Sequence, residues 1–161
     1  MPDDFTLALP VLALHELEES PLLVLPTSPL AMRQRVEKMG KYFRREFRTD
    51  FPPMLASEVP GEHGCIPYEA HLFFEDARDR LEEGKAFPSR IVGASCFRWQ
   101  TWTNAEPSWE FSWVWFHPFS RRRGHLSRAW PQFKEKYGNF AMSEVLSREM
   151  EAFLAKRSAA T

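Results

Sequence analysis

The fold is decided by residues 108–127, which read SWEFSWVWFHPFSRRRGHLS. In the first part of this stretch, large rings alternate with other side chains over Ser108–Phe116. Successive side chains of a β-strand point to opposite faces of a sheet, so this period of two predicts a strand. One face is expected to carry Trp109, Phe111, Trp113 and Trp115, and the other Ser108, Glu110, Ser112, Val114 and Phe116. We interpret the ring-bearing face as core or as a dimer interface.

A second strand is expected just before this one. Arg90–Trp102 is β-branched and small at its start and aromatic at its end, which favours a strand. Turn residues over 104–107 then predict an antiparallel hairpin with Ser108–Phe116. Four small residues in the earlier strand are expected to let another element lie close against the sheet. They are Gly93, Ala94, Ser95 and Cys96.

The other elements alternate between strands and helices. A strand is expected over 22–25, followed by a helix with Ser28 as N-cap and Pro29 at its first position, which ends before Pro52. A loop over 50–67 and a strand over 70–74 are expected next, before the hairpin. The helix has an apolar face made of Met32, Val36, Met39, Phe43 and Phe47. After the hairpin, a helix is expected from near Ser127 to Tyr137, closed by Gly138. A short strand within 140–145 and a last helix follow, and the last helix is expected to turn Met150, Phe153 and Leu154 inward. This order predicts an α/β or α+β fold, with a mixed, mostly antiparallel central sheet flanked by helices.

Composition limits the class of protein. The chain has 161 residues, of which 43% are hydrophobic and 27% charged, and this predicts a single domain over 1–161. No run approaches the roughly 18 apolar residues of a membrane-spanning helix. Leu7–Leu14 is short, is broken by Pro10 and follows Asp3 and Asp4, so it does not fit a signal peptide. Two cysteines without zinc-ligand spacing fit a reducing cytoplasm and predict no metal site. A net charge of -1 makes a nucleic-acid partner unlikely.

Chemistry is expected where the strand Ser108–Phe116 gives way to a helix. Arg121–Ser127 contains three arginines and a glycine directly before that helix. Free amides and the helix dipole favour an anion there, arginines add charge-assisted hydrogen bonds, and glycine lets the backbone come close. This combination predicts a phosphate-binding site. The alternative is a solvent-exposed corner in which Gly124 only turns the chain.

The same segment resembles the GNAT superfamily of acyl-CoA-dependent N-acetyltransferases. The resemblance runs from about Arg90 to Lys156. Trp115–Pro118 matches the apolar-x-x-Pro end of the family's fourth strand, and Arg121–Leu126 matches its Arg/Gln-x-x-Gly-x-Gly/Ala loop, with Leu126 at a position that the family fills with a small residue. The resemblance implies an acyl-CoA N-acyltransferase-like fold with residues 90–156 as the acyl-CoA-binding core and residues 1–67 on the acceptor side. The family's last two strands are not expected after the last helix.

The resemblance also implies a set of site residues. Acetyl-CoA, the co-substrate, would be bound by Phe116, His117, Arg121, Arg122, Arg123, Gly124, His125, Leu126 and Ser127. The loop amides would hold its diphosphate, and backbone groups near Phe116 and His117 would hold the pantetheine arm and polarise the acetyl carbonyl. Glu110 is the candidate catalytic base, and its alternative role is an exposed charge paired with Arg98 across the hairpin. His117 and His125 are candidates for proton transfer, although hydrogen-bonded structural roles are favoured for both.

Three functions follow from these observations. The first is an N-acetyltransferase that moves an acetyl group from acetyl-CoA to an amine of a small molecule or peptide. The second is an inactive binding module of the same fold, which contacts a protein or nucleic acid through the Arg121–Trp130 patch. The third is a structural protein that forms a homodimer through its tryptophan face.

Overall fold

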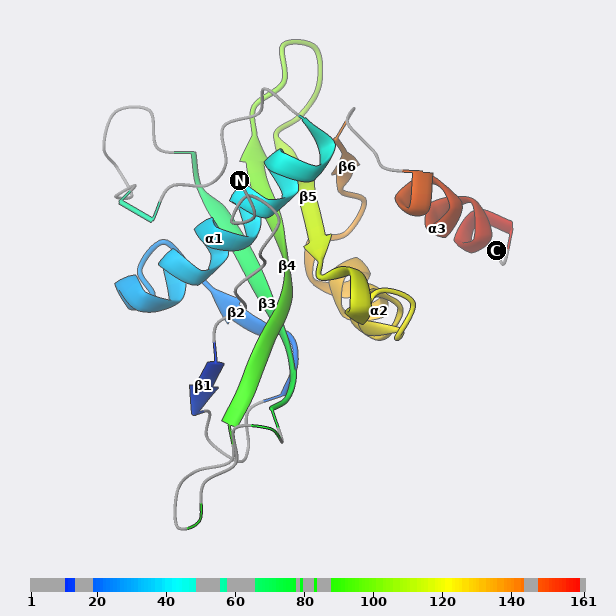
Figure 1. The fold of residues 1–161 in the computed structure, drawn as a ribbon. Coiled ribbons are helices and arrows are strands. Elements are labelled where there is room, and N and C mark those ends of the chain that lie inside the picture. The colour runs from blue at the N-terminus through cyan, green and yellow to red at the C-terminus, as the bar shows by residue number, and fades with distance from the viewer. Residues whose placement is uncertain are drawn as a thin grey trace.

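A computed structural model of the chain describes residues 11–13, 19–48, 56–57, 66–77, 79, 83, 88–143 and 148–159. They form one six-stranded sheet with three α-helices around it (Figure 1). The elements are β1 Val11–Ala13, β2 Leu22–Val24, α1 Leu30–Phe47, β3 Tyr68–Asp76, β4 Pro88–Gln100, β5 Ser108–Phe116, a 3₁₀ turn Pro118–Ser120, α2 His125–Tyr137, β6 Ala141–Met142 and α3 Arg148–Ala159. No helix within these ranges is long and apolar enough to cross a membrane.

The mixed, mostly antiparallel sheet is confirmed. Its order is β2-β3-β4-β5-β6, and β1 pairs with the start of β4. Of the pairings seen among the described strands, β5 with β6 is parallel and the others are antiparallel. The predicted order of strands and helices from residue 22 onward is also confirmed. The sequence did not predict β1, and most of the loop expected over 50–67 lies outside the described residues.

Two apolar clusters make the core, one on each face of the sheet. The first cluster lies under α1 and confirms the predicted apolar face of this helix. Val36 and Met39 are fully buried in it, and the other residues of that face pack against the cluster. The second cluster lies under α2 and contains Phe97, Phe111, Trp130 and Phe133. Phe153 and Leu154 of α3 pack against it as expected. Figure 1 shows α1 and α2 on the two sides of the sheet, with β5 between them.

The expected single face of rings on β5 is wrong. Trp113 and Trp115 belong to the cluster of α1, whereas Phe111 belongs to the cluster of α2 and Trp109 packs against it. The cause is a β-bulge: Cys96 of β4 pairs with Trp113 and Phe97 pairs with Phe111, so the register skips Ser112. One extra residue moves all side chains beyond it to the opposite face. The rings are therefore core on both faces of the sheet.

The run of small residues in β4 allows a close approach of β5. Gly93 pairs with Phe116, and a Cβ atom on Gly93 would lie 2.4 Å from Cδ1 of Phe116 and 2.5 Å from the carbonyl oxygen of Trp115. The element that lies against the small residues is therefore the neighbouring strand and its last aromatic ring.

Both long helices begin differently from the expectation. Ser28 is not the N-cap of α1: its hydroxyl accepts a hydrogen bond from the Leu25 N–H at 2.8 Å, and Pro29 occupies the cap position. Helix α2 begins at His125, two residues before Ser127, after Gly124 in the left-handed conformation with φ 81°. Pro131 consequently falls in the second turn rather than the first. Gly138 closes α2 as predicted.

Candidate functional site

The candidate site lies beside the end of β5. Among the described residues, β5 pairs with β6 at Glu110 with Ala141 and at Phe111 with Met142, followed by a hydrogen bond of 3.1 Å from the Ser143 N–H to the Phe111 carbonyl. On the other side of β5, the His117 N–H donates to the Val92 carbonyl of β4 at 2.8 Å.

Backbone groups of alternate residues point to opposite edges of a strand. Since His117 faces β4, the N–H and C=O groups of Val114 and Phe116 face the other edge of β5. In the described part of the chain, no strand pairs with β5 along this edge beyond Phe111. The last residues of β5 therefore offer main-chain donors and acceptors to a ligand.

A pocket of about 600 Å³ opens beside this edge. Its walls come from the end of β5, from Pro118 and residues 120–127, from Phe47 at the end of α1 and from Met150, Ala152 and Phe153 of α3. The sequence-predicted ligand residues that line it are Phe116, Arg121, Arg122, Arg123, Gly124, His125, Leu126 and Ser127. The pocket thus has an apolar side and a cationic side, and it suits an elongated ligand with an apolar arm and an anionic end.

The first turn of α2 forms part of the cationic side. The Arg128 N–H makes the first bond of the helix, to the Gly124 carbonyl at 3.0 Å. The N–H groups of His125, Leu126 and Ser127 precede it and have no acceptor within the helix. No acidic residue occupies this turn, so the positive end of the helix dipole is not neutralised from within the helix.

The three consecutive arginines have different surroundings. Arg121 donates from Nε to the Phe116 carbonyl at 2.9 Å and from Nη2 to the Glu46 carboxylate at 2.5 Å. Arg123 donates from Nη1 to the Glu75 carboxylate at 2.7 Å. Arg122 is exposed and has a positive φ of 64°. Two of the three guanidinium groups therefore hold the loop to neighbouring elements.

Glu46 and Glu75 hold the arginines of the candidate site, and the sequence did not single them out. Glu46, in the last turn of α1, accepts from both Arg121 and the Trp115 indole N–H, at 2.5 and 3.1 Å. Glu75, at the end of β3, accepts from Arg123 and contacts His125. No sequence signal marks either carboxylate, because each meets its partners only in the folded sheet.

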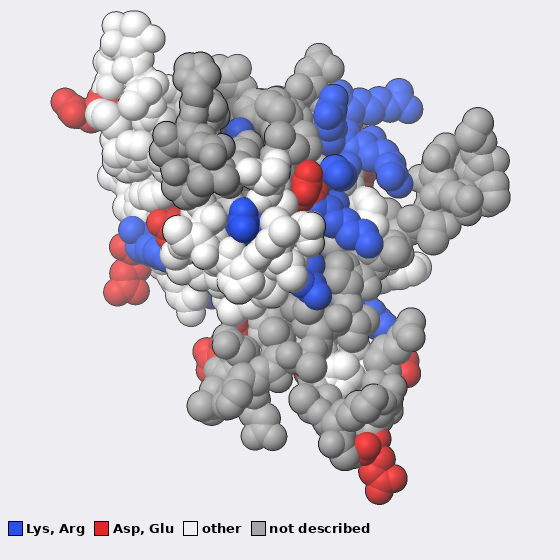
Figure 2. Space-filling model, turned by 90° about the vertical axis from the view of Figure 1, so that its left-hand side faces the viewer, with Lys and Arg blue, Asp and Glu red and all other residues white. Residues whose placement is uncertain are grey.

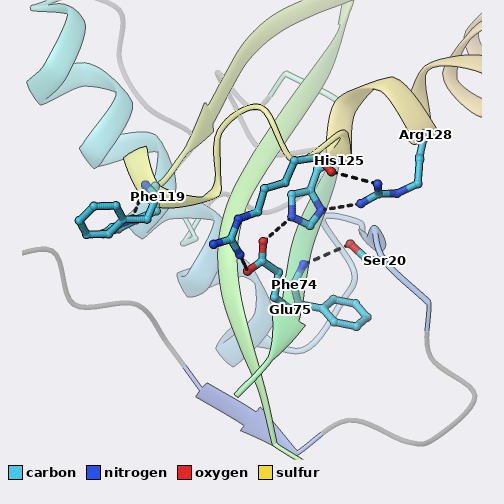
Figure 3. Close-up of polar contacts among 8 residues, drawn as sticks. Ser20, Phe74, Glu75, Phe119, His125 and Arg128 are labelled. Carbon is cyan, nitrogen blue, oxygen red and sulfur yellow. Dashed lines mark hydrogen bonds and ion pairs between the residues drawn. The ribbon is translucent and has the colours of Figure 1, made fainter. Parts of the chain in front are cut away.

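His125 has a structural place at the start of α2 (Figure 3). Its Nε2 lies 2.7 Å from the Glu75 carboxylate, and its Nδ1 lies 3.5 Å from Nη2 of Arg128. A guanidinium only donates, so Nδ1 accepts and Nε2 carries the proton that Glu75 accepts. The ring also stacks on Phe116, with centroids 5.7 Å apart and planes at 13°. These contacts favour the hydrogen-bonded structural role over proton transfer.

His117 does not line the pocket, unlike the other predicted ligand residues. Its Nδ1 accepts from the Phe119 N–H at 3.2 Å and so caps the 3₁₀ turn. Burial, and then the nearby Arg121, lower the pKa of His117 below its usual value. Its own N–H is bonded to the Val92 carbonyl, so among the backbone groups near Phe116 and His117 this amide is not available to a ligand carbonyl. The groups of Val114 and Phe116 are in the position to polarise it.

Glu110 lies on β5 outside the pocket lining. It is half-buried, stands opposite Arg98 in the β4 register, and accepts from the Ser112 hydroxyl at 3.1 Å. Its Cα is four residues from Val114, a separation of about 13 Å along an extended strand. A base at Glu110 would therefore act on an acceptor that enters from the far end of the open edge.

The remaining candidates belong to the core. Trp130 is 6% exposed and packs edge-on against Phe111, Phe140 and Phe153, so it cannot stack on a base in an Arg121–Trp130 patch. Cys96 is fully buried. Within the described ranges, no cluster of His, Cys, Asp and Glu could hold a metal ion.

Comparison of the chain with models of known protein families and with curated proteins finds no match. The functional assignment therefore depends on the pocket and the groups that line it.

Proposed function

We propose that the chain is an acyl-CoA-dependent N-acetyltransferase, which moves an acetyl group from acetyl-CoA to an amine. The observation that carries the proposal is the pocket, which joins the free N–H groups of α2, an open strand edge and an apolar wall in one space of about 600 Å³. These three parts suit the diphosphate, the amide-rich pantetheine arm and the hydrocarbon portions of the co-substrate in turn.

Each part of the pocket has a role in the proposed reaction. The N–H groups of His125, Leu126 and Ser127 hold the diphosphate against the positive end of α2. Main-chain groups of Val114 and Phe116 orient the arm and donate to the acetyl carbonyl oxygen. Phe47, Met150 and Phe153 keep water from the arm.

Proton transfer completes the proposal. Bound acetyl-CoA supplies an acetyl thioester, whose acyl carbon is the electrophile. The acceptor amine must lose a proton to act as nucleophile, and Glu110 is the carboxylate on β5 that receives it through a chain of water molecules. The new C–N bond forms as the C–S bond of the thioester breaks, and the departing CoA thiolate takes a proton from solvent. The acceptor is a small molecule or a peptide with a free amine.

Ser127→Glu tests coenzyme binding at the helix N-terminus. Ser127 is exposed, lies in the first turn of α2 and lines the pocket. A carboxylate there is compatible with the helix dipole, so the variant is expected to melt at or above the wild-type temperature. The same charge repels a diphosphate, and CoA is expected to bind at least tenfold more weakly, measured by calorimetry and by the thermal shift that CoA produces.

Ser127→Gln is the matched control, because glutamine has nearly the same size as glutamate and carries no charge. It should retain most of the affinity for CoA. Equal affinity of wild type and Ser127→Glu would contradict diphosphate binding at this turn. Release of free thiol from acetyl-CoA in the presence of an amine panel then separates the enzyme from an inactive binding module, which would bind CoA without releasing thiol.

A further inference from the structure

We propose that Arg122 is the arginine of the 121–123 loop that contacts a phosphate group of the bound ligand, while Arg121 and Arg123 are positioning residues. The proposal takes the identity of the ligand from the proposed function, but its argument comes from the contacts of the loop.

The two outer arginines are already engaged. Arg121 joins the end of β5 to α1 through the Phe116 carbonyl and Glu46. Arg123 joins the loop to the end of β3 through Glu75. A ligand phosphate bound to either guanidinium would lie beside the carboxylate that already accepts from it, and the two anions repel each other.

Arg122 is in the opposite situation. In the part of the chain that the structure describes, its side chain has no hydrogen bond or ion pair, and the residue both lines the pocket and faces solvent. Its backbone has φ 64°, a conformation that is uncommon for residues other than glycine and that persists where surrounding contacts require it. The contacts on both sides therefore fix a loop in which, among the described residues, the guanidinium of the middle arginine has no carboxylate partner.

The charge of the neighbouring surface supports an anionic ligand. Helix α1 has six Lys and Arg residues and two Glu residues. Arg44 and Arg45 lie in the last turn of α1, just before Phe47, which lines the pocket. Figure 2 shows a group of Lys and Arg side chains on the side of the molecule that carries α1, with others scattered around it. An anion near Phe47 thus meets the cationic last turn of α1 in addition to Arg122.

Binding measurements on single variants test this division of roles. The probes are CoA, dephospho-CoA and inorganic pyrophosphate, titrated into wild type, Arg122→Gln, Arg121→Gln and Arg123→Gln. Arg122→Gln should bind CoA about ten- to a hundredfold more weakly, because it loses a charge-assisted hydrogen bond to the ligand. Its melting temperature should be unchanged, because the substitution removes no contact within the protein. If the substitution weakens the binding of CoA alone, Arg122 contacts the 3′-phosphate. If it weakens the binding of all three probes, Arg122 contacts the diphosphate.

The positioning residues should behave differently. Arg121→Gln and Arg123→Gln should lower the melting temperature by about 1–4 °C. Their effects should be reproduced by Glu46→Gln and Glu75→Gln, with little further change when both partners of a pair are replaced. Lys41→Gln is the charge control, since Lys41 is exposed on α1, pairs with Glu37 and does not line the pocket.

The outcomes separate this inference from the proposed function. The assignment of Arg122 is overturned if Arg122→Gln binds every probe with wild-type affinity. It is also overturned if Lys41→Gln loses as much affinity as Arg122→Gln. If wild type binds pyrophosphate through Arg122 but does not bind CoA, the proposed function fails and the inference stands. If wild type binds none of the probes, both fail.

Discussion

Replacing Gly93 with alanine is expected to lower the free energy of unfolding by about 3 kcal/mol, at the upper end of the range for overpacked cores. The added Cβ would lie 2.5 Å from the Trp115 carbonyl oxygen, which belongs to the backbone and cannot rotate away. It would also lie 2.4 Å from Cδ1 of Phe116. Relief requires β4 and β5 to separate at the strand end where the pocket lies, so binding of the proposed coenzyme should weaken together with stability.

Urea unfolding of Gly93→Ala, Phe116→Ala and the double variant measures this effect. Phe116→Ala removes the ring contact but leaves the carbonyl, so the substitution at Gly93 should cost less in that background and still destabilise the protein. A Gly93→Ala variant that unfolds at the wild-type urea concentration would show that β4 and β5 do not approach as closely as described.

The sequence predicted the order of elements because most of them have a clear period. Alternation over residues 108–116 is strong enough to place β5, and the apolar spacing of α1 places its buried face. The same alternation led to the wrong face for half of the rings. A bulge at Ser112 depends on how β5 pairs with β4, and no local property of SWEFSWVWF distinguishes a bulged strand from a regular one.

The segment that forms the candidate site was predictable from the sequence, but the different contacts of its three arginines were not. A strand, a basic loop with glycine and a helix start identify residues 121–127 from local chemistry alone. Which arginine is available depends on Glu46 and Glu75, which lie far away in the chain. Ser28 illustrates the same limit at short range, since a serine before a helix can bond the preceding turn as well as cap the helix.

A buried histidine that the sequence did not single out is expected to make the protein acid-sensitive. His71 of β3 is 5% exposed, and burial first, then Lys136, lower its pKa from 6.5 to about 3. Its Nε2 lies 3.3 Å from the Tyr137 hydroxyl, which donates to Glu69 at 3.2 Å, while its Nδ1 is buried without a hydrogen-bond partner. Burial and Glu69 raise the pKa of Tyr137, so its hydroxyl remains protonated.

The sign of the pH dependence follows from these values. Between pH 6.5 and about 3, the unfolded chain binds a proton at His71 and the folded chain does not. The contribution of neutral His71 to stability is therefore complete above pH 6.5, and stability falls by about 1.4 kcal/mol for each pH unit below it. The loss should reach about 2–3 kcal/mol by pH 4.5.

Urea midpoints at several pH values between 7.5 and 4.5 measure this loss. His71→Phe should flatten the profile, because phenylalanine cannot titrate and the ring fits among Phe97, Phe133 and Tyr137. Tyr137→Phe is the control: it removes the hydroxyl but leaves His71 buried, so it should lower stability by about 1 kcal/mol and keep the wild-type slope, since burial is the main cause of the lowered pKa. Parallel profiles for wild type and His71→Phe would assign the acid sensitivity to other groups.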